Sequence, residues 1–216
     1  MKRTKYIQSL IEEGEHQQLD FKFEISDARK IARTFVAFAN TDGGKLLIGV
    51  KDNREIAGIR SEEERFMAEE AVKNFCKPNI EFISREWIIN KKVVLEIRIN
   101  KGADGPYYAL APDGRWLVYI RVKDQNILAN KILVRALQRK SSDAGTYINY
   151  SQNEKLLLQF LESNRSITFS EFRKMANISP AQTENILVNF LALDILEARF
   201  SDDEFHYRLA GDFIAE

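Results

Sequence analysis

The stretch from Ala37 to Asp52 constrains the fold more than any other part of the chain, because it joins a helix end, a tight turn and a buried strand. Its turn, Asn-Thr-Asp-Gly-Gly at residues 40–44, cannot continue a helix, since Asn and Asp favour local hydrogen bonds and glycine permits positive φ angles. Residues 45–50 are almost wholly apolar, as in a strand covered on both faces. The stretch predicts a sharp reversal and a central strand that delivers Asp52 just past its end.

The flanking segments predict an α+β domain with a mixed sheet and flanking helices over residues 1–140. Before the central stretch, Leu19, Phe21 and Phe23 alternate with polar residues, which predicts a half-buried strand that carries Asp20 and Lys22 on its polar face. Strand patterns recur at residues 80–89, 93–99, 107–111 and 116–122, and helical patterns at residues 28–39, 61–76 and 129–140.

The last third of the chain has a different pattern. Residues 141–152 are rich in Ser, Asp, Gly, Thr and Asn, a composition typical of linkers. Residues 153–216 then predict three helices followed by a short hairpin, the order of a winged helix-turn-helix. The sequence therefore predicts two domains, 1–140 and 153–216, joined by a linker.

Charge divides unevenly between these parts, although the chain as a whole is neutral. Residues 1–140 hold 26 Lys and Arg against 20 Asp and Glu, whereas residues 141–216 hold 6 against 12. A polyanion is therefore attracted to the first part and repelled by the second. No apolar run approaches the roughly 20 residues that span a bilayer, and the single cysteine, Cys76, excludes an internal disulfide. We expect a soluble cytoplasmic protein with no membrane partner.

Several ordered motifs together resemble the schlafen/AlbA-type DNA-binding domain family over about residues 12–140. The resemblance rests on Glu15 with the run Leu19-Asp20-Phe21-Lys22, on residues 37–41, 43–44 and 47–52, and on Pro106-Tyr107 and Tyr119-Ile120-Arg121. It implies nucleic-acid binding. In nuclease-active relatives three acids are implicated, and they correspond here to Glu15, Asp20 and Asp52, with Asp20 standing where Glu is typical.

The residues of the first domain are compatible with two functions. Oxygen ligands suit Mg²⁺ or Mn²⁺, so the three acids are candidate metal ligands and catalytic residues of a metal-dependent nuclease. Alternatively, cations bind nucleic-acid phosphates with little sequence choice. The candidate cations are Lys22, Arg29, Lys30, Arg33, Lys45, Lys51, Arg121 and Lys123. ATP is not expected, because the Gly43-Gly44 turn follows a helix and precedes a strand, the reverse of a phosphate-binding loop.

The predicted winged helix is a poor match for DNA. Its recognition segment, residues 179–189, contains no Lys or Arg, and its wing tip reads Ser-Asp-Asp-Glu at residues 201–204. We therefore interpret it as a module for dimerisation or partner binding. The leading hypothesis is a nucleic-acid-binding regulator that resembles transcription regulators and forms a homo-oligomer. A nuclease and an assembly module without nucleic acid are the alternatives, and the choice between RNA and DNA stays open.

Overall fold

The computed structural model describes residues 2–60, 62–103, 105–142 and 150–211, which form two compact units, Met1–Ala129 and Asn130–Glu216. The division falls before the helix at residues 131–140, which the sequence analysis assigned to the first domain. Most of the predicted linker, residues 143–149, lies outside the described residues. None of the helices in the described ranges is long and apolar enough to cross a membrane.

A four-stranded mixed sheet organises the first unit. Its strands are β1 (Leu19–Lys22), β2 (Gly44–Ile48), β4 (Phe82–Ile89) and β5 (Lys92–Ile99), in the order β1-β2-β5-β4. β1 and β2 are parallel, and the other two pairings are antiparallel. The apolar run after the Gly-Gly turn is therefore an inner strand, as predicted, and the α+β class with a mixed sheet is confirmed.

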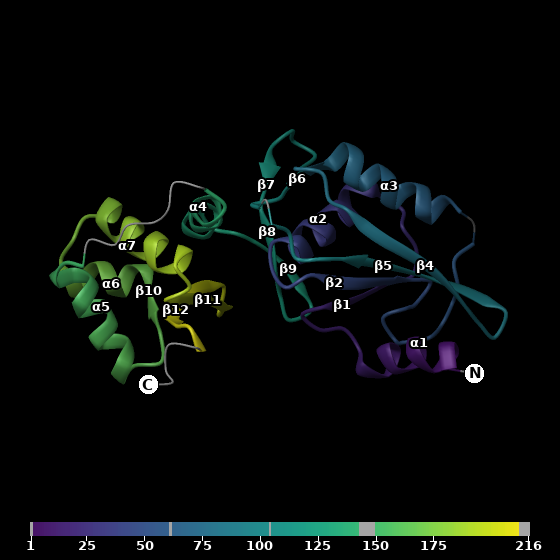
Figure 1. Ribbon diagram of the computed structural model, residues 1–216, viewed down its shortest axis with the longest axis horizontal. Helices are drawn as coiled ribbons and strands as arrows, with labels where there is room; N and C mark the ends of the chain where they lie inside the picture. Colours follow the sequence, from purple (N-terminus) through teal and green to yellow (C-terminus); the bar gives the residue numbers. More distant parts are fainter. Residues whose placement is uncertain (1, 61, 104, 143–149, 212–216) are drawn as a thin grey trace. The chain divides into compact units, whose positions relative to one another are not determined.

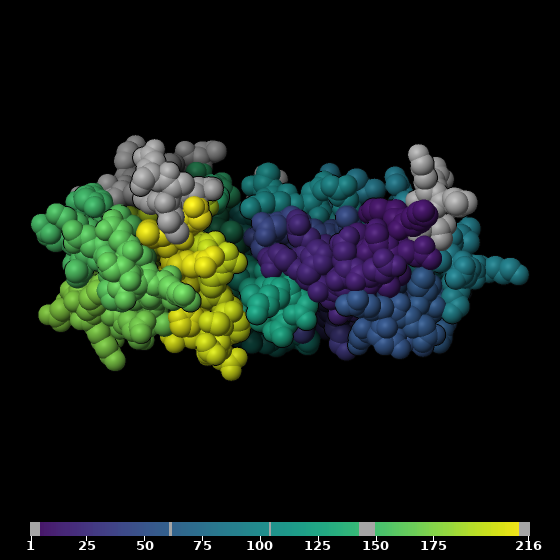
Figure 2. Space-filling view, turned by 90° about the horizontal axis from the view of Figure 1, so that it is seen from below, coloured from purple at the N-terminus to yellow at the C-terminus, as the bar shows by residue number. Residues whose placement is uncertain are grey.

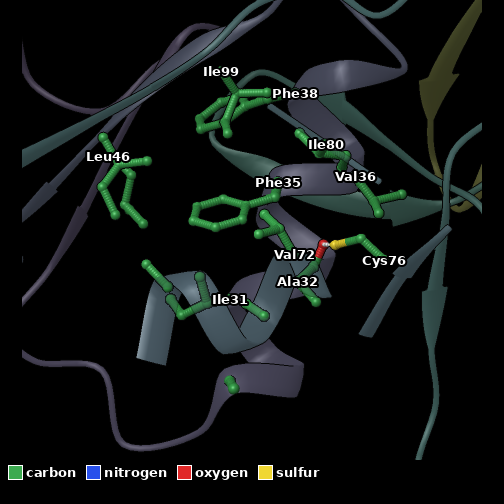
Figure 3. Packing of buried hydrophobic residues seen from close by; sticks show 14 of the residues in the cluster. Ile31, Ala32, Phe35, Val36, Phe38, Leu46, Val72, Cys76, Ile80 and Ile99 are labelled. Carbon is green, nitrogen blue, oxygen red and sulfur yellow. Dashed lines mark hydrogen bonds between the residues drawn. The ribbon is translucent and has the colours of Figure 1, made fainter. Parts of the chain in front are cut away.

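Helices cover both faces of this sheet. α1 (Lys2–Glu13) lies on one face, and α2 (Ala28–Ala39) with α3 (Glu63–Phe75) lies on the other (Figure 1). Figure 2 shows α1 in purple across the first unit. On the opposite face, Phe35 and Phe38 of α2 point toward Leu46 of β2 (Figure 3). Each face thus has its own apolar core, which explains why β2 is apolar at nearly every position.

Short strands from later in the chain pack beside α2. β3 (Cys76–Lys77), β6 (Tyr108–Leu110) and β7 (Trp116–Leu117) form one small sheet, and β8 (Tyr119–Val122) and β9 (Gln125–Leu128) form a hairpin. The predicted strand over residues 116–122 is thus divided between two sheets. Both β6 and β8 contact α2, so the end of the first unit returns to the helix that precedes the Gly-Gly turn.

The second unit combines helices with a small antiparallel sheet. After α4 (Lys131–Lys140) come α5 (Gln152–Ser163), β10 (Ile167–Thr168), α6 (Phe169–Ala176), α7 (Pro180–Ala192), β11 (Leu196–Ser201) and β12 (Glu204–Leu209), and the sheet order is β10-β12-β11. Ser151, Thr168 and Ser179 cap α5, α6 and α7 in reciprocal capping boxes. The structure contains the predicted three helices and hairpin, with β10 added between the first two helices.

α4 packs along α7 and carries only positive charge. Its Lys131 and Arg135 bind Glu184 of α7, and Lys140 binds Asp194 just beyond that helix. Arg139 donates a hydrogen bond to Asn189 of α7. The expectation that this helix closes the first domain is therefore corrected: it belongs to the second unit, where its cations pair with Glu184 and Asp194.

Candidate functional site

The turn after α2 forms hydrogen bonds with segments of the first unit that lie far along the sequence. Asn40, which caps the C-terminus of the helix, donates from its side-chain amide to the carbonyl oxygens of Tyr107 (2.8 Å) and Tyr119 (3.0 Å). Its amide oxygen accepts from the Tyr107 N–H at 2.8 Å. The next residue, Thr41, accepts from the N–H of Arg121 at 2.9 Å. The motif therefore positions β6 and β8 against the start of the central strand, a role that sequence reasoning missed.

The two glycines of the turn are required by packing. Gly43 has a φ of +70°, and a Cβ there would lie 2.8 Å from the Ile99 carbonyl oxygen. A Cβ on Gly44 would lie 2.4 Å from the Phe38 ring. Both distances are shorter than a real Cβ contact allows, so larger residues would force the chain apart.

Arg121 forms a buried ion pair with Asp20. Its side chain is 1% exposed, that of Asp20 is 4% exposed, and the guanidinium Nη2 lies 3.0 Å from the Asp20 Oδ1. The guanidinium also donates to the Leu19 carbonyl oxygen and the Asn126 Oδ1, and it lies 5.2 Å from the centre of the Phe38 ring. The prediction of Arg121 as a phosphate contact is corrected, because the residue is enclosed and both terminal nitrogens of its guanidinium donate within the protein.

Asp20 lies in the interior, not on a polar strand face as predicted. β1 is covered on the α2 side by the β8–β9 hairpin, which comes from the far end of the unit and carries Arg121. Lys22 remains partly exposed, and its Nζ lies 3.0 Å from the Asp20 Oδ2. One carboxylate is thus flanked by two cations.

Glu15 lies next to this pair. Its Oε1 accepts a hydrogen bond from the Phe21 N–H at 2.9 Å, along the free edge of β1. Partial burial raises the pKa of the Glu15 carboxyl, the Phe21 N–H opposes the rise, and the hydrogen bond and charge of Asp20 add to it. Two of the three acids proposed from the resemblance are therefore brought together.

The third acid, Asp52, does not complete a metal site. It lies exposed in the turn after β2. Within the described ranges, no group of three or more His, Cys, Asp or Glu side chains is placed to hold a metal ion. At Asp20, the neighbouring Lys22 and Arg121 already neutralise the carboxylate, so it has little negative charge left to attract a metal ion. The residues present do not fit a three-carboxylate Mg²⁺ or Mn²⁺ centre.

The three predicted cations of α2 lie close together on one helix and have no acidic partner among the described residues. Arg29 lies 5.1 Å from the centre of the Phe75 ring and Arg33 lies 5.9 Å from that of Tyr119, while Lys30 is exposed. In the part of the chain that the structure describes, none of the three takes part in an ion pair. The two guanidiniums lie against rings in cation–π contact and are half-buried, with the Arg33 Nε enclosed, so an anion would reach them through their outer N–H groups.

The remaining predicted cations are dispersed. Lys51 is paired with Glu55 at 2.9 Å, and Lys123 is exposed at the tip of the β8–β9 hairpin. Lys45 neighbours Tyr6 of α1, so it lies on the other face of the sheet from α2. Sequence reasoning missed Arg60, which lies 5.7 Å from the centre of the partly exposed Phe23 ring. No local pattern connects those two residues, which are far apart in the sequence.

Comparisons with known proteins agree with this description of the first unit. The profile of the family described as Schlafen, AlbA_2 matches residues 15–130, and a PCI domain profile matches residues 148–203. No curated protein matches the chain.

Solved structures match as well, including the two that follow. The DIP2311 protein from Corynebacterium diphtheriae is 16% identical over 75% of this chain and 40% of its own, with a TM-score of 0.46. The N-terminal domain of a RecG-related protein from Nitrosomonas europaea is 20% identical over 57% of this chain and 94% of that domain, with a TM-score of 0.40. The chain spans less than half the length of the DIP2311 protein.

Proposed function

The chain belongs to the Schlafen, AlbA_2 family, and from this premise we propose that its first unit binds nucleic acid through the exposed side of α2. The observation that carries the proposal is the set of three neighbouring cations on that helix, Arg29, Lys30 and Arg33, without an acidic partner among the described residues. Phosphate groups are the partners such a surface attracts, with affinity that depends on salt and little on sequence. Lys123 is a further candidate contact.

Binding is favoured over cleavage. A nuclease of the type first considered needs Glu15, Asp20 and Asp52 around a metal ion, whereas Asp20 is enclosed with Arg121 and Asp52 lies apart from such a group. We therefore propose a regulatory role, in which the protein acts by occupying RNA or DNA. The nuclease remains the alternative that the experiment must separate.

The test is retention of labelled RNA and duplex DNA at a series of salt concentrations, with Mn²⁺ or with EDTA. Replacing Arg29, Lys30 and Arg33 by Gln should reduce the slope of log affinity against log salt by about two to three, since each lost phosphate contact contributes about 0.7 to 0.9. The matched control replaces three exposed lysines elsewhere, Lys73, Lys77 and Lys91, by Gln. Equal losses of affinity in both triple variants would show that only the net charge of the protein matters, and would contradict the proposal.

Cleavage of the RNA and DNA is measured in the same binding reactions, with Mn²⁺ or with EDTA. Intact nucleic acid in Mn²⁺ is the expected result. Metal-dependent cleavage that disappears in Glu15→Gln and Asp52→Asn would establish the nuclease instead, and these positions are chosen because Asp20 substitutions threaten the fold.

For the second unit we propose a winged-helix-type module that binds protein, including a second copy of the chain. Its order of helices and strands supports the winged-helix assignment, and its α7 surface is covered by α4. The exposed turn at residues 201–204 is acidic, so phosphates would be repelled there. Light scattering on the full chain tests self-association. A dimer that dissociates when Asp202, Asp203 and Glu204 are replaced by Asn, Asn and Gln supports the proposal. A monomer at all concentrations contradicts self-association.

A further inference from the structure

A pocket of about 350 Å³ opens on the α1 side of the first unit, where β1 and β2 begin and β5 ends. Leu10 and Leu19, whose buried side chains belong to the α1-side core, contribute to its wall. Three side-chain cations also line it, Lys45, Arg98 and Lys101. The volume is within the range of small-molecule sites, which begins at about 300 Å³.

Two of these cations face each other across neighbouring strands. Lys45 of β2 and Arg98 of β5 are directly opposite in the antiparallel register. Side chains in that relationship point to the same face, with Cβ atoms about 5 Å apart, and like charges there destabilise a sheet. Within the described ranges neither cation forms an ion pair, so no carboxylate oxygen lies within 4.0 Å of either one.

The acids of the neighbourhood have other partners. Glu13 lies 3.6 Å from His16, and Asp42 lies 3.9 Å from Lys101 and accepts from Gln17. Glu96 is buried on the same face of the sheet and accepts from the Tyr6 hydroxyl (2.7 Å) and the Trp87 indole N–H (2.8 Å). Glu13 and Asp42 line the pocket together with Lys45, Arg98 and Lys101, so its three cations exceed its two carboxylates and the excess charge is positive.

We propose that this pocket binds a terminal phosphate group between the Lys45 ammonium and the Arg98 guanidinium. A phosphate monoester fits because its oxygens accept from a guanidinium fork and from a lysine at once, and the apolar wall excludes water from one side of the contact. The room beside Leu10 and Leu19 accommodates the group that carries the phosphate. Free nucleoside monophosphates and the 5′ end of a nucleic acid share this chemistry.

This site is independent of the cations on α2. Lys45 stands next to Leu46 and Leu47, whose side chains enter the α2-side and α1-side cores respectively. Because side chains alternate along a strand, Lys45 shares the α1 face with Leu47. Loss of nucleic-acid binding in the α2 variant would therefore leave the phosphate pocket intact, and the two proposals fail separately.

Calorimetric titration of the full chain with adenosine monophosphate and with inorganic phosphate tests the pocket. Saturable binding is expected, and Lys45→Gln and Arg98→Gln should each weaken it at least about tenfold, the loss typical of a charge-assisted hydrogen bond. Lys73→Gln, an exposed lysine on α3, is the matched control and should bind as the parent chain does. Circular dichroism of each variant confirms that it is folded.

A second arm identifies the source of the phosphate. One oligonucleotide is compared with and without a 5′-phosphate on the parent chain and on Lys45→Gln. A preference for the phosphorylated end that disappears in Lys45→Gln assigns the pocket to nucleic-acid ends, whereas binding of the monophosphate without such a preference assigns it to free nucleotides. If none of the phosphate compounds binds saturably at millimolar concentration, or if both pocket variants bind as tightly as Lys73→Gln, the proposal is overturned.

Discussion

The side-chain amide of Asn40 pairs with both backbone groups of Tyr107, donating to its carbonyl oxygen and accepting from its N–H, each at 2.8 Å. In this way a helix-ending residue supplies the hydrogen bonds that a neighbouring strand would normally give. The same amide also donates to the Tyr119 carbonyl oxygen, so one side chain holds two segments.

Asn40→Ala should therefore destabilise the first unit by about 2–3 kcal/mol, because it leaves partly buried backbone groups of Tyr107 and Tyr119 without partners. Urea unfolding measures the loss. Asn74→Ala, on the exposed surface of α3, serves as the control and should change stability by less than about 0.5 kcal/mol. Similar losses for both variants would show that the Asn40 contacts contribute little.

The buried pair of Asp20 and Arg121 should respond strongly to removal of one partner. Asp20→Asn leaves the enclosed Arg121 guanidinium without its counter-ion, which costs about 3–5 kcal/mol. Arg121→Met should cost less, because Lys22 stays beside the Asp20 carboxylate. The double variant should recover part of that loss, since neither charge remains. A double-mutant cycle in urea measures the coupling, and losses that simply add would contradict a direct interaction.

Replacing Glu15 by Gln should have an effect that depends on pH. The pKa of Glu15 is raised in the folded protein, so folding is favoured when this carboxyl is protonated, and that contribution is lost as pH rises from the ordinary value of 4.5 through the folded value. Gln stays neutral and can still accept from the Phe21 N–H. The variant should therefore gain stability relative to the parent chain as pH increases from 4 to 7.

Unfolding curves at several pH values test this, with the exposed Glu81→Gln as the control. A stability difference for Glu15→Gln that stays constant over the range would contradict the raised pKa.

The packing of α4 on α7 predicts where the chain can be divided. A fragment of residues 130–216 retains the buried Ile132 and Ala136 and the ion pairs to Glu184, whereas a fragment of residues 150–216 exposes the α7 surface they cover. The longer fragment should unfold cooperatively and at higher urea concentration, by circular dichroism. Equal midpoints for the two fragments would mean that α4 adds no stability.

Local patterns were sufficient for most of the elements and insufficient for the burial of Asp20. The alternation of Leu19, Asp20 and Phe21 is the same whether a polar residue faces water or a second layer, and only the β8–β9 hairpin, about a hundred residues later, decides which. Charge alone likewise could not separate the enclosed Arg121 from the less buried cations of α2. The phosphate contacts proposed for those cations remain predictions.

The boundary of the second unit was obscured by composition. The Ser- and Asp-containing run after Lys140 has the character of a linker, yet α4 before it belongs with α7. A usable signal was present, since a helix of four cations and no acids matches the acids at positions 184 and 194.

The contacts of Asn40 also bear on the order in which the chain folds. Its partners Tyr107 and Tyr119 lie 67 and 79 residues further along the chain, and Arg121 lies 101 residues after its partner Asp20. Contacts of such long sequence separation slow folding, because the loop must close before the contact can form. During synthesis the Asn-Thr turn and the acid on β1 stay without partners until β8 has left the ribosome, so nascent chains that stop before residue 121 are the ones most exposed to aggregation or chaperone capture.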